Sequence, residues 1–223
     1  MTPGTKSVLF GAHQFLLHPL FVALAWWKLF GPPLDLRLWF AFFIHDLGYL
    51  GKRNLDGPEG ETHPEPGAKI MEKLFGKKWG ELCRYHSRSL ARKAGVPPSL
   101  LSYADKYATA LYPRWLYLTQ VKATGEVREY LQHFFDSLQN KGKYAHQPDT
   151  LRDKATPSGI AHGSLDHWYW AITRRYNQEW LRSKQQELQP ELQAFFQQHD
   201  RRKRPEHPDA RERVNTTKPT GSG

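Results

Sequence analysis

The sequence predicts an all-α protein, and three observations lead to that class. Apolar residues recur at helical spacing in segments of roughly ten to twenty residues. Gly and Pro separate these segments, for example at Gly31-Pro32-Pro33. No segment alternates apolar and polar residues as a strand would, and no internal repeat is evident. With 223 residues, of which 39% are hydrophobic and 13% aromatic, the chain can bury a substantial core.

The helices of the first third are expected to surround one apolar centre. An apolar segment over about 8–30 should form a buried helix that stops at Gly31. Asp35 can cap the next helix, which carries the run LWFAFFIHD. After a loop rich in Gly and charge, Thr62 and Glu65 have the spacing of a capping box and predict the start of a further helix.

Helical patterns continue along the rest of the chain. One spans about 78–93 and is closed by Gly95, and another starts at Ser99 and is limited by Pro113. The remaining patterns lie at about 114–123, 125–139, 164–187 and 190–199. From Asp200 the chain has almost no apolar residues, so 200–223 is expected to be a disordered basic tail.

Composition limits the setting in which the protein works. A single cysteine, Cys83, excludes an intrachain disulfide and a cysteine-based zinc site, and favours a reducing compartment. The N-terminus lacks the pattern of a secretory signal, so a cytoplasmic location is expected. The most apolar stretch is too short and too interrupted to be a transmembrane segment, although a peripheral membrane contact near Trp26-Trp27 is an alternative. The net charge of +10 favours anionic partners.

Two polar residues, His45 and Asp46, end the most hydrophobic segment of the chain. Burying such a pair costs several kcal/mol unless a hydrogen bond, an ion pair or a metal satisfies it, and a hydrogen-bonded pair at a helix end is the simplest alternative to a metal. Other imidazoles and carboxylates recur along the helical region, at His18, His63, His86 and Asp105. A helical bundle can bring such residues into one interior site, where Asp46 could bridge two ions.

Three segments resemble the HD-domain metal-dependent phosphohydrolase superfamily: HPLFVALAWW with FIHDLG, THPEPGAKIMEKL, and HSRSLARKAGVPPSLLSYADKYA. The resemblance covers about 10–112 and implies an HD-type helical domain over 1–199, in which about 113–199 is a C-terminal helical extension. It also implies metal ligands. Those shared by mononuclear members match His18, His45, Asp46 and Asp105, and the additional ligands of binuclear members match His63 and His86.

The resemblance has departures and open alternatives. Many members have Lys or His where this chain has Tyr49, and the Gly-Tyr-Pro signature of cyclic dinucleotide phosphodiesterases is absent. His13 rivals His18 as first ligand, and Asp105 could instead pair with Lys106 or Arg114. The mixed set of imidazoles and carboxylates suits one or two divalent ions of Mn, Fe, Co or Ni, with Mg or Zn as further options.

The expected function is therefore metal-dependent hydrolysis of an anionic phosphorylated small molecule, in particular a nucleotide. Asp46, His63 and His86 are the expected catalytic residues. Basic residues near the ligands are expected to contact substrate phosphate, unless they are ordinary surface charges: Lys52, Arg53, Arg84, Arg88 and Lys106.

Two other functions stay open. The same ligand order is shared with diiron oxygenases related to myo-inositol oxygenase, which would use two irons to activate dioxygen. A non-catalytic HD protein that binds nucleotide is the other alternative. Such a protein could instead bind nucleic acid through the basic tail.

Overall fold

The computed structural model describes residues 1–139 and 165–200, and in these ranges it contains helices and no strand. The predicted all-α class is confirmed. No helix in the described ranges is both long enough and apolar enough to cross a membrane. The predicted tail falls outside the described residues from 201 onward.

Two short helical regions begin the chain, where one long helix was predicted. Helix α1 spans Pro3–Phe10 and α2 spans Leu17–Phe30. The break follows Gly11, where the N–H of Ala12 donates to the carboxylate of Glu126 at 3.2 Å instead of to a carbonyl of α1. Helix α2 ends at Gly31 as predicted, with a positive φ of 92°.

Helix α3 spans Leu36–Ile44, and Asp35 caps it by accepting a hydrogen bond from the backbone N–H of Arg37 at 2.9 Å. The short 3-10 helices η1, Leu47–Tyr49, and η2, Gly60–Thr62, then lead into α4, Pro64–Phe75. The predicted capping box is wrong. Thr62 donates its hydroxyl hydrogen to the carbonyl of Glu59, and Glu65 pairs with Arg84 instead.

The predicted helix over 78–93 is divided into α5, Lys77–Arg84, and α6, Arg88–Lys93. Between them, the carbonyl of Tyr85 accepts a hydrogen bond from the N–H of Ser99 at 3.0 Å, and Ser87 caps α6. This tertiary contact lies where α5 ends, two residues before His86. His86 therefore lies in a turn rather than on a helix.

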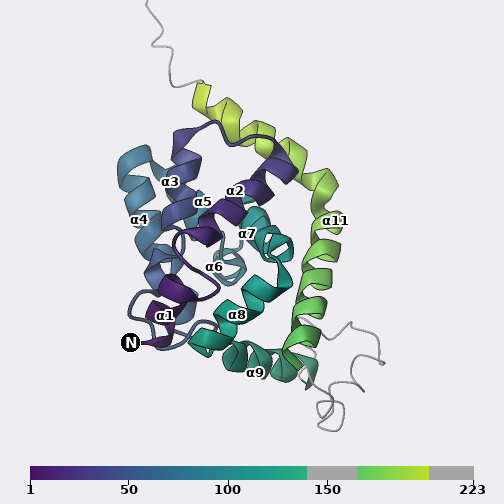
Figure 1. The fold of residues 1–223 in the computed structure, drawn as a ribbon. Coiled ribbons are helices and arrows are strands. Elements are labelled where there is room, and N and C mark those ends of the chain that lie inside the picture. The colour runs from purple at the N-terminus through teal and green to yellow at the C-terminus, as the bar shows by residue number, and fades with distance from the viewer. Residues whose placement is uncertain (140–164, 201–223) are drawn as a thin grey trace, which may run out of the picture.

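The remaining helices are α7, Leu100–Leu111, α8, Arg114–Thr124, α9, Glu126–Gln139, and α11, Leu165–Asp200. Helix α11 joins the two helices predicted at 164–187 and 190–199, with Pro190 inside it. Figure 1 shows its axis change direction between the green and yellow parts, as a proline inside a helix commonly causes.

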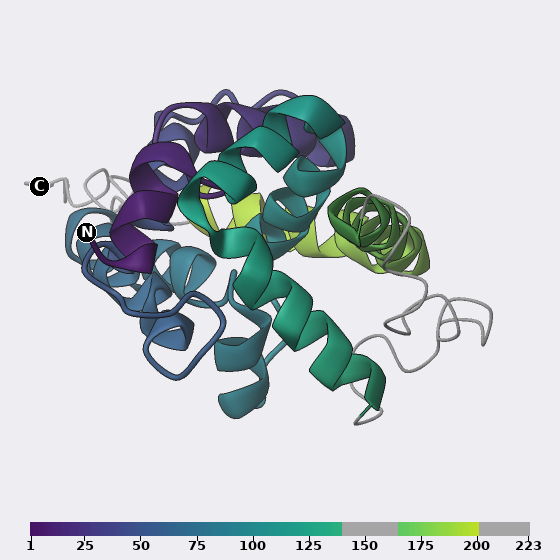
Figure 2. The ribbon, with the colours of Figure 1, turned by 60° about the horizontal axis from the view of Figure 1, so that its bottom comes forward.

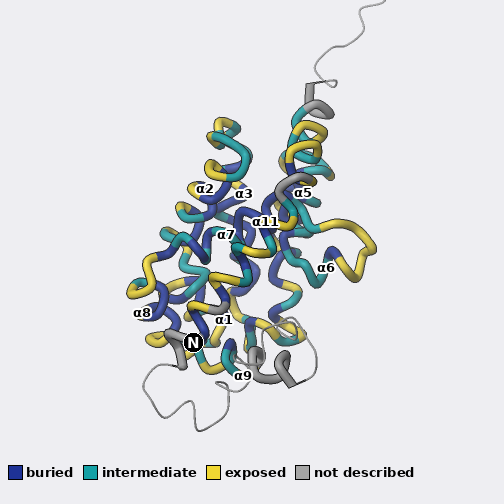
Figure 3. Tube along the Cα trace, turned by 90° about the vertical axis from the view of Figure 1, so that its right-hand side faces the viewer, coloured by how far each residue is buried: buried dark blue, intermediate teal, exposed yellow. Residues whose placement is uncertain are grey.

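Two apolar clusters hold the helices together. The larger one packs α2, α3, α4, α5 and α7 around fully buried residues such as Trp26, Phe42 and Trp79, and α11 covers it with Leu181 and Leu188. The smaller one joins α1, α8, α9 and the start of α11. Figure 2 shows α11 lying along one side of the bundle, and Figure 3 shows buried residues concentrated where α2, α3 and α7 meet.

Candidate metal centre

The structure brings all six predicted ligands together, although they come from five separate parts of the chain. They form two groups whose potential ligand atoms lie within 4.8 Å of one another. The first group contains His18, His45, Asp46 and Asp105, and the second contains Asp46, His63 and His86. All six residues are buried.

Asp46 belongs to both groups and offers a different carboxylate oxygen to each. Its Oδ2 lies 3.3 Å from Nε2 of His18 and 3.2 Å from Nε2 of His45. Its Oδ1 lies 3.4 Å from Nε2 of His63 and 3.3 Å from Nε2 of His86. This geometry is that of a carboxylate placed to bridge two ions.

Three of the imidazoles are each oriented by a hydrogen bond from Nδ1 to the backbone carbonyl three residues earlier. Nδ1 of His45 lies 2.8 Å from the carbonyl of Phe42, and Nδ1 of His63 lies 2.7 Å from that of Gly60. Nδ1 of His86 lies 2.5 Å from the carbonyl of Cys83. A carbonyl only accepts, so each Nδ1 carries the hydrogen and each Nε2 presents a lone pair to the site. This is the usual outer contact of a metal-binding histidine.

The second group contains a contact that a metal ion would satisfy. Nε2 of His63 and Nε2 of His86 are 2.9 Å apart, and both rings already donate through Nδ1. A hydrogen bond between them would require a doubly protonated ring. Burial, with the neighbouring His86, lowers the pKa of His63 well below its usual value, so protonation there is unfavourable. Two ligands at about 2.1 Å from one ion and at right angles would be about 3 Å apart, which fits this spacing.

The first group also has unsatisfied atoms that a metal would satisfy. Nε2 of His18, Nε2 of His45 and Oδ2 of Asp46 are buried, and no other described residue forms a hydrogen bond of acceptable geometry with them. Burial disfavours a charged His18 ring, but the carboxylates of Asp105 and Asp46 outweigh it and raise the pKa to about 9. In the metal-free protein a proton therefore occupies the position that a cation would take.

His18, and not His13, joins the ligand group. His13 forms a hydrogen bond through Nδ1 with the hydroxyl of Ser7 at 2.7 Å and packs against Tyr49 with ring centroids 4.4 Å apart and ring planes tilted by 38°. The two carboxylate oxygens of Asp105 have different partners. Oδ1 lies 3.1 Å from Nε2 of His18, while Oδ2 accepts a hydrogen bond from Lys106 at 2.8 Å. The predicted pairing with Lys106 therefore occurs, and Asp105 also lies among the other candidate ligands.

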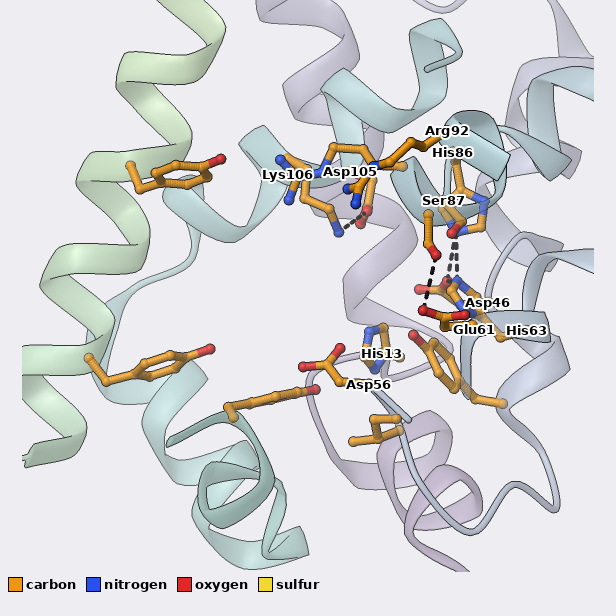
Figure 4. A pocket seen from close by; sticks show the side chains of 17 residues that line it. His13, Asp46, Asp56, Glu61, His63, His86, Ser87, Arg92, Asp105 and Lys106 are labelled. Carbon is orange, nitrogen blue, oxygen red and sulfur yellow. Dashed lines mark hydrogen bonds and ion pairs between the residues drawn. The ribbon is translucent and has the colours of Figure 1, made fainter. Parts of the chain in front are cut away.

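A cavity of about 610 Å³ opens beside the second group. Asp46, His63, His86 and Asp105 reach it, and Arg88, Arg92 and Lys106 supply positive charge along its wall (Figure 4). Tyrosines from the C-terminal helices also line it: Tyr130, Tyr169 and Tyr176. Sequence reasoning missed these tyrosines, since it identified no activity-related motif after Pro113.

Three of the predicted phosphate-binding residues lie outside this cavity. Lys52 donates to the hydroxyl of Thr62 at 2.8 Å, and Arg53 is exposed on the loop before η2. Arg84 forms ion pairs with Glu65 at 3.3 Å and Glu72 at 3.5 Å. Arg88 and Lys106 do reach the cavity, and Arg88 also stacks over Trp180 at 5.0 Å.

Comparisons with models of known protein families, with curated proteins and with solved structures give no match for this chain. The resemblance to HD-domain proteins therefore remains a prediction from the sequence. The case for a metal centre depends on the geometry of the six residues.

Proposed function

We propose that the protein is a metal-dependent phosphohydrolase of the HD type that acts on an organic phosphate ester. One observation carries the proposal. Asp46 presents one oxygen to each of two buried His/Asp groups, and these groups border a cavity with three cationic side chains. Metal ligands beside cations that can hold a phosphate are the two components that phosphoryl transfer requires.

In this proposal, some residues of the site hold the metal and others contact the substrate phosphate. Bound metal would lower the pKa of a water molecule and polarise a phosphoryl oxygen. The imidazoles, with their Nδ1 atoms fixed by backbone carbonyls, hold their Nε2 atoms toward the site. Arg88 and Arg92 can donate to phosphate oxygens and offset the charge that develops there as the P–O ester bond breaks and water oxygen bonds to phosphorus.

The cavity favours an organic ester over inorganic phosphate alone. Its volume of about 610 Å³ is within the range typical of pockets for small organic ligands. Tyrosine rings line the same cavity as the cations, and they can contact a planar or apolar group. A nucleotide, which has both phosphate and an aromatic base, would suit this combination of side chains.

The first test is metal content by mass spectrometry, followed by phosphate release with Mn, Co and Mg. We expect two ions per chain in the wild type, one in His63→Ala and few or none in Asp46→Ala, with hydrolysis lost in the last. Asp56→Ala is the matched control, because Asp56 lines the same cavity but belongs to neither ligand group. Hydrolysis that survives in Asp46→Ala would refute the proposal.

A diiron oxygenase is the second candidate, and the completeness of the second ligand group favours it. Four imidazoles and two carboxylates are enough to hold two irons. Protein purified without oxygen would then contain two irons per chain and would form an oxygen-dependent product. Chelator sensitivity would not discriminate, since both classes of enzyme lose their metal. Tight nucleotide binding without turnover under any metal would instead indicate a non-catalytic protein.

A further inference from the structure

An exposed apolar surface covers the outer side of α2 and the start of α3, away from the ligand groups. On α2 it consists of Leu16, Leu20, Leu24 and Trp27, which are spaced so that they share one face of the helix. On and before α3 it consists of Leu34, Leu36 and Phe40. We name these seven residues the α2–α3 apolar surface. Surfaces of this kind usually mark an interaction site.

Aromatic contacts extend this surface across neighbouring helices. Phe15, just before α2, meets Phe43 of α3 with ring centroids 5.8 Å apart. Phe40 of α3 meets Phe75 at the end of α4 at the same distance, 5.8 Å. Ile70 and Leu74 are exposed on α4 as well. The apolar residues thus continue from α2 over α3 to α4.

Two leucines protrude from the surface. Leu34 is 85% exposed and Leu36 is 81% exposed, so neither packs against its own chain. They follow Pro32-Pro33 in the turn between α2 and α3, near the C-terminal end of α2, where Trp27 is 59% exposed. Protruding aliphatic residues with a Trp beside them suit insertion into an acyl layer, because Trp favours the boundary between apolar and polar phases.

The charges near the surface are positive. Lys28 on α2 and Lys69 and Lys73 on α4 are exposed, and none of the three forms an ion pair with another described residue. Two carboxylates lie close to these lysines in the sequence, Asp35 and Glu72, and each is already in an ion pair, Asp35 with Arg37 and Glu72 with Arg84. Apolar side chains flanked by unpaired lysines complement an anionic lipid surface.

We propose that the α2–α3 apolar surface binds the surface of an anionic membrane, with Leu34, Leu36 and Trp27 inserted and the lysines at headgroup level. The chain's own residues 140–164 and 201–223 are predominantly polar and provide too few apolar side chains to cover this surface. A second copy is a poorer partner, since a symmetric contact would bring the same unpaired lysines together. The membrane contact is independent of the reaction at the metal centre.

Sedimentation with vesicles tests this proposal on the full chain. We expect the wild type to bind vesicles of phosphatidylcholine with phosphatidylglycerol, and to bind vesicles of phosphatidylcholine alone far more weakly. The double variant Leu34→Glu, Leu36→Glu should lose more than about tenfold in binding, because it removes two inserted side chains. Trp115→Glu is the matched control, since Trp115 is 70% exposed on α8 and lies outside the surface.

Folding and charge are checked separately. Both substituted leucines are almost fully exposed, so the variant should retain its helical content and its metal content. Replacing Lys28, Lys69 and Lys73 by Ala should remove the preference for anionic vesicles. Wild-type protein that binds neither vesicle would overturn the proposal, and so would equal loss in Trp115→Glu. A dimer that the leucine variant disrupts, without vesicle binding, would assign the surface to a second copy instead.

Discussion

At the scale of single residues, the candidate site depends on which nitrogen of each histidine carries the hydrogen. His45, His63 and His86 all donate from Nδ1 to the carbonyl three residues earlier. The arrangement is local, so the backbone itself supplies the orientation. It leaves Nε2 of all three rings free for a cation, which is the chemical reason that the site suits a metal.

Metal affinity should rise with pH, because the first ligand group must release a proton. His18 has a pKa raised to about 9 in the metal-free protein, so at pH 7 its ring is protonated. A metal displaces that proton, and affinity should increase about tenfold per pH unit up to that pKa. His63, whose pKa is lowered well below its usual value, is already neutral and contributes no proton.

Calorimetry at pH 7 in two buffers of different ionisation enthalpy measures this release, and we expect about one proton per chain. His18→Gln is the control and should release none. The folding stability of the metal-free protein should change with pH in the opposite direction to the metal affinity. The folded pKa of His18, about 9, lies above the ordinary histidine value of 6.5, so its stabilising contribution is complete below pH 6.5 and disappears as pH rises through 9. Proton release that is unchanged in His18→Gln would contradict this assignment.

The proposed phosphate contact can be tested by comparing Arg92 with Arg84. Arg92 lines the cavity, whereas Arg84 lies outside it and pairs with Glu65 and Glu72. We expect Arg92→Gln to lower kcat/KM for a phosphate ester by roughly ten- to a hundredfold, since it removes charge-assisted hydrogen bonds. Arg84→Gln should leave kcat/KM nearly unchanged. Equal decreases in kcat/KM for the two variants in steady-state assays would mean that the substrate phosphate does not contact Arg92.

At the scale of elements, close backbone packing decides how the two ligand groups meet. A Cβ atom on Gly48 would lie 1.9 Å from the carbonyl oxygen of His63, and one on Gly67 would lie 2.5 Å from that of Ile44. The turn after His45-Asp46 therefore touches the start of α4 directly. This contact places His63 beside Asp46.

Gly48→Ala should separate these two segments and weaken the second ligand group. We expect a loss of about 1–3 kcal/mol in the free energy of unfolding from overpacking, and metal content near one ion per chain. Gly95→Ala is the control, because Gly95 has a φ of 66° with nothing near its missing Cβ. That variant should lose about 1 kcal/mol from the backbone conformation alone and keep both ions. If Gly48→Ala retains two ions, the close contact between Gly48 and His63 is not needed to form the second ligand group.

At the scale of the whole molecule, the C-terminal helices complete the cavity that the ligand-bearing helices begin. Carboxylates of α9 join the two parts. Glu126 accepts hydrogen bonds from the N–H of Ala12 and the hydroxyl of Tyr130, and Glu129 accepts from the N–H groups of Leu55 and Asp56. Residues after Pro113 are thereby tied to the segment that precedes His18 and to the loop before His63.

Substrate selection should therefore depend on α11, although none of its described side chains belongs to either ligand group. Tyr176→Ala is expected to raise KM for an aromatic phosphate ester by roughly tenfold, since stacking on a ring is lost, while metal content stays the same. Gln178→Ala is the control on the same helix, since Gln178 does not line this cavity. A Tyr176→Ala variant with unchanged KM would indicate that the substrate stays on the cationic side.

The sequence by itself determined the helical class, the end of α2 at Gly31, the cap of α3 at Asp35, and the candidate ligands. These follow from local chemistry: helical spacing of apolar residues, glycines with positive φ, and polar residues inside apolar segments. Tertiary structure alone decided what depends on distant contacts. Glu126 accepts a hydrogen bond at the break after Gly11, and Ser99 donates one at the end of α5. Arg84 is held away from the cavity that Arg92 lines by its ion pairs with two carboxylates. Such contacts join residues far apart in the chain, so no local pattern could have revealed them.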